Sequence, residues 1–301
     1  MDKTFKELTV HQPKQPVVLV VAGAEEKKLL QAVSTATSEG WVSPIFIGIG
    51  SKTPLLNLIH QWAPELEKYT ILSAENAIHV GELACHVIQH GGVLMKGLME
   101  TNELLRAILH CRKEMLDGPL LSHISLLQVP YRRGVFGLSD TSVLISPSLE
   151  EKAEIIRQGV RFLRRLGCTS PKVAVLSAVE RANSSMPDTL EAVQLARMGE
   201  QGSFGSCLVD GPVSFDIAMD RTAAKTKGYP GHIQGDADFL LAPDIVSGNL
   251  LGKCFNYTPD SQFAGFLLGT KVPVILTSRA SSLENKLLSI RLGAVLAGGY
   301  I

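Results

Sequence analysis

Near the carboxyl end, hydroxyl and guanidinium side chains form the stretch best suited to chemistry on an anion. The segment 277–279, Thr-Ser-Arg, follows an apolar, β-branched run at 272–276, which predicts a buried strand. Ser281 and Glu284 have the spacing of a capping box, so we expect a helix to begin there. Backbone N–H groups at a helix start attract anions, and arginine can bind phosphate through two parallel hydrogen bonds. The pattern therefore predicts an anion site, with an ordinary polar turn as the alternative.

Two further polar segments follow predicted strands and precede predicted helices. In the first, Lys96 and Gly97 lead through Thr101 into a helix that carries Arg106 on its second turn. The second, 244–253, places an acid, two glycines, an asparagine and a lysine around another helix start. Glycine lets the backbone approach a ligand closely. Taken alone, each segment is better explained by ordinary turn chemistry than by a ligand site.

Length and composition bound the kind of protein that can carry these segments. The chain has 301 residues, which exceeds the usual size of one domain and predicts two. It is 45% apolar and 19% charged, as expected of a globular protein with a sizeable core. Lys plus Arg and Asp plus Glu both number 29, so the formal net charge is zero. This balance argues against broad binding to nucleic acid or an anionic membrane, but leaves room for a local basic pocket.

Cysteine usage and the amino-terminal sequence indicate the compartment. The five cysteines are scattered and never form C-x-x-C, so we interpret them as free thiols in a reducing environment. The first 16 residues contain no apolar core of a signal peptide, and no run approaches the ~20 apolar residues of a membrane span. We therefore expect a cytoplasmic protein with no membrane partner.

Strand-like and helix-like patterns alternate along the chain, which predicts an α/β fold with parallel, doubly wound sheets. The segment 130–134 reads as a hinge, after which the alternation restarts. Helical segments are expected from residue 250 and from residue 262. The strands are expected at 17–22, 45–47, 70–72, 93–95, 123–129, 143–145, 173–176, 207–209, 239–242 and 272–276.

Several short segments, taken together and in order, are far more specific than any one of them. The segments are Lys96-Gly97 with Leu104-Leu105-Arg106, Asp210-Gly211-Pro212, Gly235 to Asp238, Pro243-Asp244, Ser247 to Asn249 and Thr277-Ser278-Arg279. With these segments the chain resembles the phosphate acetyl/butyryl transferases, and the branch of phosphate butyryltransferases most closely. The resemblance extends from about residue 17 to near the end of the chain.

The resemblance implies a fold like that of isocitrate and isopropylmalate dehydrogenases, with two doubly wound α/β domains and an active-site cleft between them. Residues 1–130 and 268–301 would form the first domain from both chain ends, and residues 131–267 the inserted second domain. Members of this family are expected to be homodimers that need no metal and no redox cofactor, with coenzyme A as a substrate.

The implied reaction is acyl-CoA plus phosphate giving acyl phosphate plus CoA, with a short, butyryl-like acyl group. By position, Ser278 would hydrogen-bond near the CoA sulfur and Arg279 would bind phosphate, with Arg106 assisting. The other residues that the resemblance assigns to substrate binding are Lys96, Gly97, Thr101, Asp140, Asp244, Gly248, Asn249, Lys253 and Thr277.

The sequence departs from the acetyltransferase branch at the expected general base. In that branch an acid stands seven positions after the motif serine, and here that position is Asn285, which cannot accept a proton at neutral pH. Glu284 is the only carboxylate within seven residues of Ser278, so we predict that it supplies the base. A cap of the last helix is an equally complete explanation of Glu284.

Three other functions stay open on the sequence. Acetyl specificity is the near alternative, because one methylene changes discrimination by only about 1–3 kcal/mol. A nicotinamide-dependent decarboxylating dehydrogenase would need a cluster of metal-binding aspartates, which the sequence does not offer convincingly. A non-catalytic protein that binds acyl-CoA or acyl phosphate is the third, since Asn285 replaces the expected acid.

Overall fold

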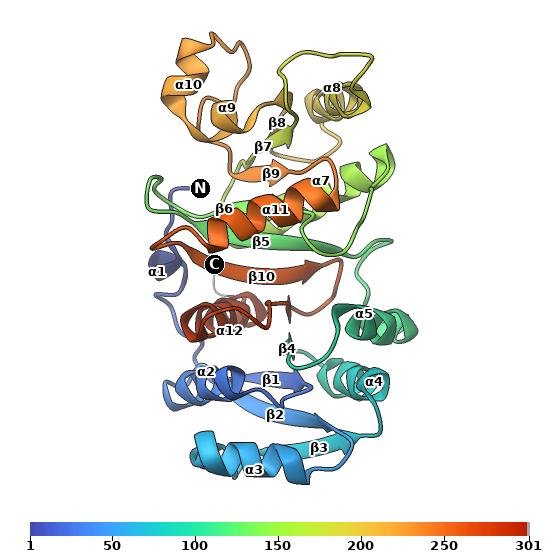
Figure 1. The fold of residues 1–301 in the computed structure, drawn as a ribbon, viewed down its shortest axis with the longest axis vertical. Coiled ribbons are helices and arrows are strands. Elements are labelled where there is room, and N and C mark those ends of the chain that lie inside the picture. The colour runs from blue at the N-terminus through green and yellow to red at the C-terminus, as the bar shows by residue number, and fades with distance from the viewer. Residues whose placement is uncertain (300–301) are drawn as a thin grey trace. The chain divides into compact units, whose positions relative to one another are not determined.

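The computed structural model describes residues 1–299 and divides into two compact units (Figure 1). Unit 1 consists of Met1–Phe5 and Ser122–Gln262. Unit 2 consists of Lys6–Leu121 and residues 263–299. Each unit is therefore assembled from separate stretches of chain. The sequence predicts domain limits after residues 130 and 267, whereas the two compact units change after residues 121 and 262. The expected limits stay a prediction.

Unit 2 contains a sheet in which five neighbouring strands are parallel and the sixth is antiparallel. Its central strand β1 has the sequence VVLVVA, and its last four residues are completely buried. Such a continuous apolar run is typical of a strand that is covered on both faces. In spatial order the strands are β3 (Thr70–Ala74), β2 (Val42–Ile49), β1 (Val17–Ala22), β4 (Val93–Lys96), β11 (Val274–Ile275) and β10 (Gln262–Leu268).

Helices pack on this sheet, with α2 beside α12 and α4 beside α5. The helix α2 ends at a glycine in the left-handed conformation, since Gly40 directly after its C-cap has φ +80°. The helical elements are α1 (Phe5–Leu8), α2 (Lys27–Ser38), α3 (Thr53–Trp62), η1 (Pro64–Leu66), α4 (Ala77–Ile88), α5 (Thr101–His110), α6 (Arg112–Met115) and α12 (Leu283–Gly298).

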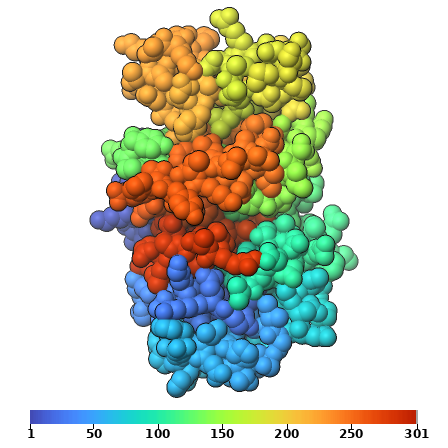
Figure 2. Space-filling model, in the orientation of Figure 1, coloured from blue at the N-terminus to red at the C-terminus, as the bar shows by residue number. Residues whose placement is uncertain are grey.

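In unit 1 the first of five neighbouring strands runs antiparallel to the second, and the others pair in parallel. In spatial order the strands are β5 (Ser122–Gln128), β6 (Phe136–Ser139), β9 (Phe239–Leu241), β7 (Lys172–Leu176) and β8 (Leu208–Val213). Its helices are α7 (Leu149–Arg165), α8 (Pro187–Glu200), α9 (Phe215–Met219), α10 (Arg221–Thr226) and α11 (Ile245–Asn256). Helix α11, orange in Figure 2, lies at the surface of this unit, and its Val246 and Leu250 are exposed.

The α/β class is confirmed, but three details expected from the sequence are wrong. The sheets are mixed, because β5–β6 and β10–β11 are antiparallel pairs. Residues 143–145 form no strand, since the Val143 N–H is donated to the Asp140 carboxylate, 2.8 Å away, and is lost to a strand ladder. The helix expected from residue 262 is strand β10, whose last six residues are buried. A short, continuously apolar run does not distinguish a strand from a buried helix.

No helix among residues 1–299 is both long and apolar enough to cross a membrane.

Candidate active site

Three loops of unit 2 leave the sheet at the carboxyl ends of neighbouring parallel strands. Residues 23–26 follow β1, residues 97–100 follow β4, and residues 276–282 follow β11. The register pairs Ala22 of β1 with Lys96 of β4, and Ile275 of β11 with Met95. All three loops therefore begin at one edge of the sheet, which is where α/β folds bind ligands.

The predicted anion-binding segment lies in the third of these loops. Thr277 and Ser281 are both buried, 4% and 3% exposed, whereas Ser278 and Arg279 are exposed. Within residues 1–299 neither the Thr277 hydroxyl nor the Ser281 hydroxyl has a hydrogen-bond partner. A buried hydroxyl without a partner is costly, so each of these two groups would gain from an acceptor.

The helix that follows begins one residue later than the capping-box pattern predicts. Its N-cap is Ser282, whose hydroxyl accepts a hydrogen bond from the Asn285 N–H at 3.1 Å. Asn285 therefore occupies the N3 position, and the capping box of Ser281 and Glu284 is wrong. Glu284 is exposed, and hydrogen bonds from its own backbone N–H and from Ser282 hold its pKa below the ordinary value. A base role for Glu284 stays a prediction.

The Arg279 guanidinium contacts a carboxylate of the same chain. Its guanidinium forms an ion pair with Glu100, and the two side chains are 54% and 63% exposed. Glu100 is the N-cap of α5, so it lies at the start of the helix that carries Thr101 and Arg106. Arg106 is exposed on the second turn of that helix, as predicted. A carboxylate on Arg279 shows that the guanidinium can bind an anion where it stands.

Lys96 and Gly97 stand where the backbone of two loops comes together. A Cβ at Gly97 would lie 2.0 Å from the Gly23 carbonyl oxygen, so only glycine fits there. The Lys96 ammonium is buried and donates to the carbonyl of Met99 at 3.0 Å. Burial lowers the pKa of Lys96, and the nearby positive charges of Arg279 and Lys286 lower it further. A desolvated ammonium in a cationic cluster would be stabilised by an anion.

Two important residues of this cluster are absent from the sequence-based prediction. Lys286 on α12 is 1% exposed, and its ammonium lies 3.0 Å from a Glu26 carboxylate oxygen. The same ammonium donates to the Ser278 carbonyl at 3.3 Å. Glu26 is the N-cap of α2, directly after β1. A lysine inside the apolar pattern of the last helix was the one feature of the sequence that could have indicated Lys286. Its partner Glu26 is distant in sequence, so motif spacing could not predict the pair.

In unit 1 the structure brings together four predicted site residues. Asp140 and Asp244 follow β6 and β9, which are parallel neighbours, so both lie at the carboxyl edge of this sheet. A Cβ at Gly248 would lie 2.1 Å from the Asp140 carbonyl oxygen. The Asn249 amide donates to the Thr141 carbonyl at 2.9 Å. These contacts fasten α11 to the turn after β6.

The carboxylates of this group are already engaged within the chain. Asp140 is 2% exposed and accepts from the N–H groups of His123, Ser142 and Val143 at 2.7–2.9 Å. Asp244 caps α11 by accepting from the Ser247 N–H at 2.8 Å, and this bond is the main reason for its lowered pKa. Both acids thus shape the loops. The exposed Lys253 follows Asn249 by one helical turn.

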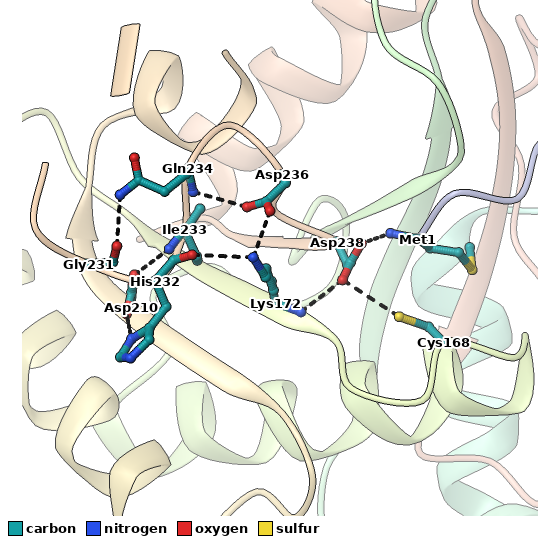
Figure 3. A network of polar contacts seen from close by, with 10 residues as sticks. All are labelled: Met1, Cys168, Lys172, Asp210, Gly231, His232, Ile233, Gln234, Asp236 and Asp238. Atoms are coloured by element: carbon teal, nitrogen blue, oxygen red, sulfur yellow. Dashed lines mark hydrogen bonds and ion pairs between the residues drawn. The ribbon is translucent and has the colours of Figure 1, made fainter. Parts of the chain in front are cut away.

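Other aspartates among the family-like segments belong to a different polar network (Figure 3). Asp236 pairs with Lys172 at 2.6 Å, and Asp210 accepts from the Ile233 N–H at 2.8 Å. Asp238 accepts from the Lys172 N–H at 2.9 Å and lies before β9, at the end opposite to Asp244. These acids hold the segment 231–238 against strands β7 and β8. Within the described part of the chain, no group of three or more His, Cys, Asp or Glu side chains could hold a metal.

The chain is similar to several characterised enzymes along nearly its whole length. A family model described as phosphate acetyl/butaryl transferase matches residues 67–294, more than half of the chain. A phosphate butyryltransferase of Clostridium acetobutylicum is 34% identical over 301 residues, with 99% of each chain covered. A phosphate acetyltransferase of Thermotoga maritima is 36% identical over 281 residues, covering 93% of this chain and 95% of the relative.

A solved structure has the same fold. It is a branched-chain phosphotransacylase from Enterococcus faecalis V583, with a TM-score of 0.80 and 29% identity. The match covers 93% of this chain and 99% of that one.

Proposed function

The chain belongs to the phosphate acetyl/butyryl transferase family, and we propose that it transfers a short-chain acyl group between CoA and inorganic phosphate. The reaction is acyl-CoA plus phosphate giving acyl phosphate plus CoA. Arg279 in the loop before α12, with two buried hydroxyls that have no partner within residues 1–299, is the observation that carries this proposal. An oxyanion with three acceptor oxygens would satisfy the guanidinium and both hydroxyls.

We infer that the loop after β11 binds the phosphoryl group. In the direction of acyl-CoA synthesis, the CoA thiolate attacks the carbonyl carbon of the acyl phosphate, and phosphate leaves. Negative charge then accumulates on the carbonyl oxygen and on the departing phosphate. The positive charges of Arg279 and Lys96, with the dipole of α12, would stabilise that charge where it develops. Ser278, exposed beside Arg279, is the proposed hydrogen-bond partner of the thiol sulfur.

The unit 1 residues Asp140, Asp244, Gly248, Asn249 and Lys253 complete the proposed substrate-binding set. Their backbone contacts support a rigid loop framework, and the exposed Lys253 offers a positive charge to the anionic groups of CoA. The proposal includes two doubly wound domains with an active-site cleft, a fold like that of isocitrate and isopropylmalate dehydrogenases, and a homodimer. Sedimentation of the purified protein checks the oligomeric state.

The acyl group is proposed to be butyryl-like, with acetyl as the alternative. Relatives named for butyryl and for acetyl transfer are similarly close, at 34% and 36% identity. One methylene in an apolar pocket changes discrimination by about 1–3 kcal/mol. A comparison of kcat/KM for acetyl-CoA and butyryl-CoA therefore decides between them.

The direct test is release of CoA thiol from butyryl-CoA with and without phosphate. We expect release only when phosphate is present, and a protein that binds butyryl-CoA without releasing thiol would reject the enzyme. Arg279→Leu should then raise the KM for phosphate or lower kcat, because hydrogen bonds to charged groups contribute about 1.5–3 kcal/mol. Unchanged kinetics of this variant would remove Arg279 from the site while leaving the activity in place.

A further inference from the structure

We propose that Glu26, held in place by Lys286, is the carboxylate that removes the proton from the CoA thiol. This inference rests on the proposed acyl transfer. It concerns the step for which the sequence offers no acid at position 285, because Asn285 cannot accept a proton. The carboxylate comes instead from the other end of the chain, in the loop after β1.

The geometry links Glu26 to the proposed thiol-binding serine through one ammonium group. The Lys286 nitrogen lies 3.0 and 3.3 Å from the two Glu26 carboxylate oxygens. It also lies 3.3 Å from the Ser278 carbonyl oxygen, which accepts a second hydrogen bond from the Ser281 N–H at 3.1 Å. Lys286 therefore fixes both the carboxylate and the main chain of Ser278.

Glu26 is reachable from solvent although its partner is not. Its side chain is 16% exposed, compared with 2% for Lys286. A carboxylate has about four lone-pair positions, so the contacts with one ammonium leave room for another donor. We assign Lys286 a positioning role and Glu26 the contact with the thiol.

The competing carboxylate is less suited to the task. Glu284 is exposed at the start of α12, and hydrogen bonds that stabilise its charged form lower its pKa. A lower pKa makes a weaker base. Asn285 also has a structural task, since its amide oxygen accepts from the Phe263 N–H at 3.1 Å. That contact explains the asparagine without any part in catalysis.

The proposed step balances in both directions. Glu26 takes the proton of the CoA S–H, and the thiolate forms a C–S bond with the acyl carbon. The C–O bond to phosphate then breaks, and the proton on Glu26 passes to the departing phosphate. In reverse, Glu26 takes the proton of the attacking phosphate, whose oxygen forms a C–O bond with the acyl carbon of the thioester. The C–S bond then breaks, and Glu26 passes the proton to the departing CoA thiolate.

Glu26→Gln is the decisive variant, since it keeps the size and an acceptor for Lys286 but removes the basicity. Glu39→Gln is its matched control. Glu39 forms another ion pair between the α2 and α12 segments, with Arg291, outside the carboxyl-edge loops. We expect Glu26→Gln to lower kcat by about 10²–10⁴ and to remove the acidic limb of its pH profile. Glu26→Gln should unfold at a lower temperature than Glu39→Gln, because it leaves the buried Lys286 ammonium without a carboxylate, and kcat is therefore compared below the unfolding range of both.

The outcomes separate this inference from the proposed function. Wild-type protein without phosphate-dependent thiol release would reject the function itself. Active wild type with equal kcat in Glu26→Gln and Glu39→Gln would overturn only the role of Glu26. If Glu26→Gln fails to fold, Glu26→Asp gives the test. If Glu26 is the base, Glu26→Asp should lower kcat and keep the acidic limb of the pH profile. Wild-type kcat in a destabilised Glu26→Asp would contradict the base role.

Discussion

At the residue scale, Arg279 is the group whose state should change most when phosphate binds. Its guanidinium is paired with Glu100, and both side chains are more than half exposed. Such a pair contributes at most about 1 kcal/mol. We predict that Glu100→Gln lowers the KM for phosphate by about fivefold or less, because phosphate no longer displaces a carboxylate. Initial rates against phosphate at low and high salt measure this, and screening should shrink the difference. An increased KM would mean that Glu100 helps to bind the substrate.

The sequence reveals those candidate residues whose placement is indicated by their immediate neighbours in the chain. Arg279 follows an apolar strand and precedes a helix, so its placement could be predicted from neighbouring residues. Lys286 and Glu26 could not, since 260 positions separate them and only the pairing of β1, β4 and β11 brings their loops to one edge. The hydrogen-bond partners of a side chain could not be predicted from the sequence either. Nothing in the spacing around Asp140 indicates that three backbone N–H groups occupy its carboxylate.

At the element scale, two adjacent serines at the start of α12 should behave in opposite ways. Ser282 caps the helix, so Ser282→Ala should cost about 0.5–2 kcal/mol of unfolding free energy and leave the KM for phosphate nearly unchanged. The Ser281 hydroxyl is buried without a partner, so Ser281→Ala should leave stability unchanged or raise it. It should raise the KM for phosphate roughly tenfold or more, as expected for a lost hydrogen bond to a charged group. Denaturant unfolding and phosphate kinetics on both variants test this prediction. If Ser281→Ala lost stability and Ser282→Ala raised the KM instead, Ser281 would be the N-cap, as the capping-box pattern predicts.

The errors in predicted elements have local physical causes. The capping box fails by one residue because Ser281 and Ser282 both offer a hydroxyl, and the sequence does not say which one meets the helix N–H groups. Strand β6 is only four residues long and was missed, while the apolar residues 143–145 after it resemble a strand. Strong elements such as β1, with six consecutive apolar residues, were predicted correctly.

At the scale of the whole molecule, each compact unit is built from chain segments that lie far apart in sequence. The chain leaves one unit and enters the other after residues 5, 121 and 262. Alternating strands and helices could be predicted, because periodicity and turn residues are local. The assignment of the first five residues to unit 1 could not, because it depends on contacts with residues more than a hundred positions away.

A substitution within residues 1–5 tests whether this segment stabilises unit 1. Phe5 is 1% exposed, and its N–H donates to the Gln128 side chain at 2.8 Å. The Lys3 carbonyl accepts from the Val135 N–H at 2.9 Å, just before β6. We predict that Phe5→Ala costs about 3–5 kcal/mol, because a buried aromatic ring is replaced by a cavity. Val10→Ala is the control, since Val10 is 61% exposed and should change little.

Hydrogen exchange, measured segment by segment in Phe5→Ala, shows which part of the chain loses stability. Amides of β6 and β9 should exchange faster in Phe5→Ala, whereas those of β1 and β2 in unit 2 should keep their protection. The contrast arises because the amino-terminal segment contacts unit 1, and the chain enters unit 2 only at Lys6. Equal loss of protection in both units would mean that they unfold as one cooperative body, and no loss in β6 would show that the first five residues do not stabilise unit 1.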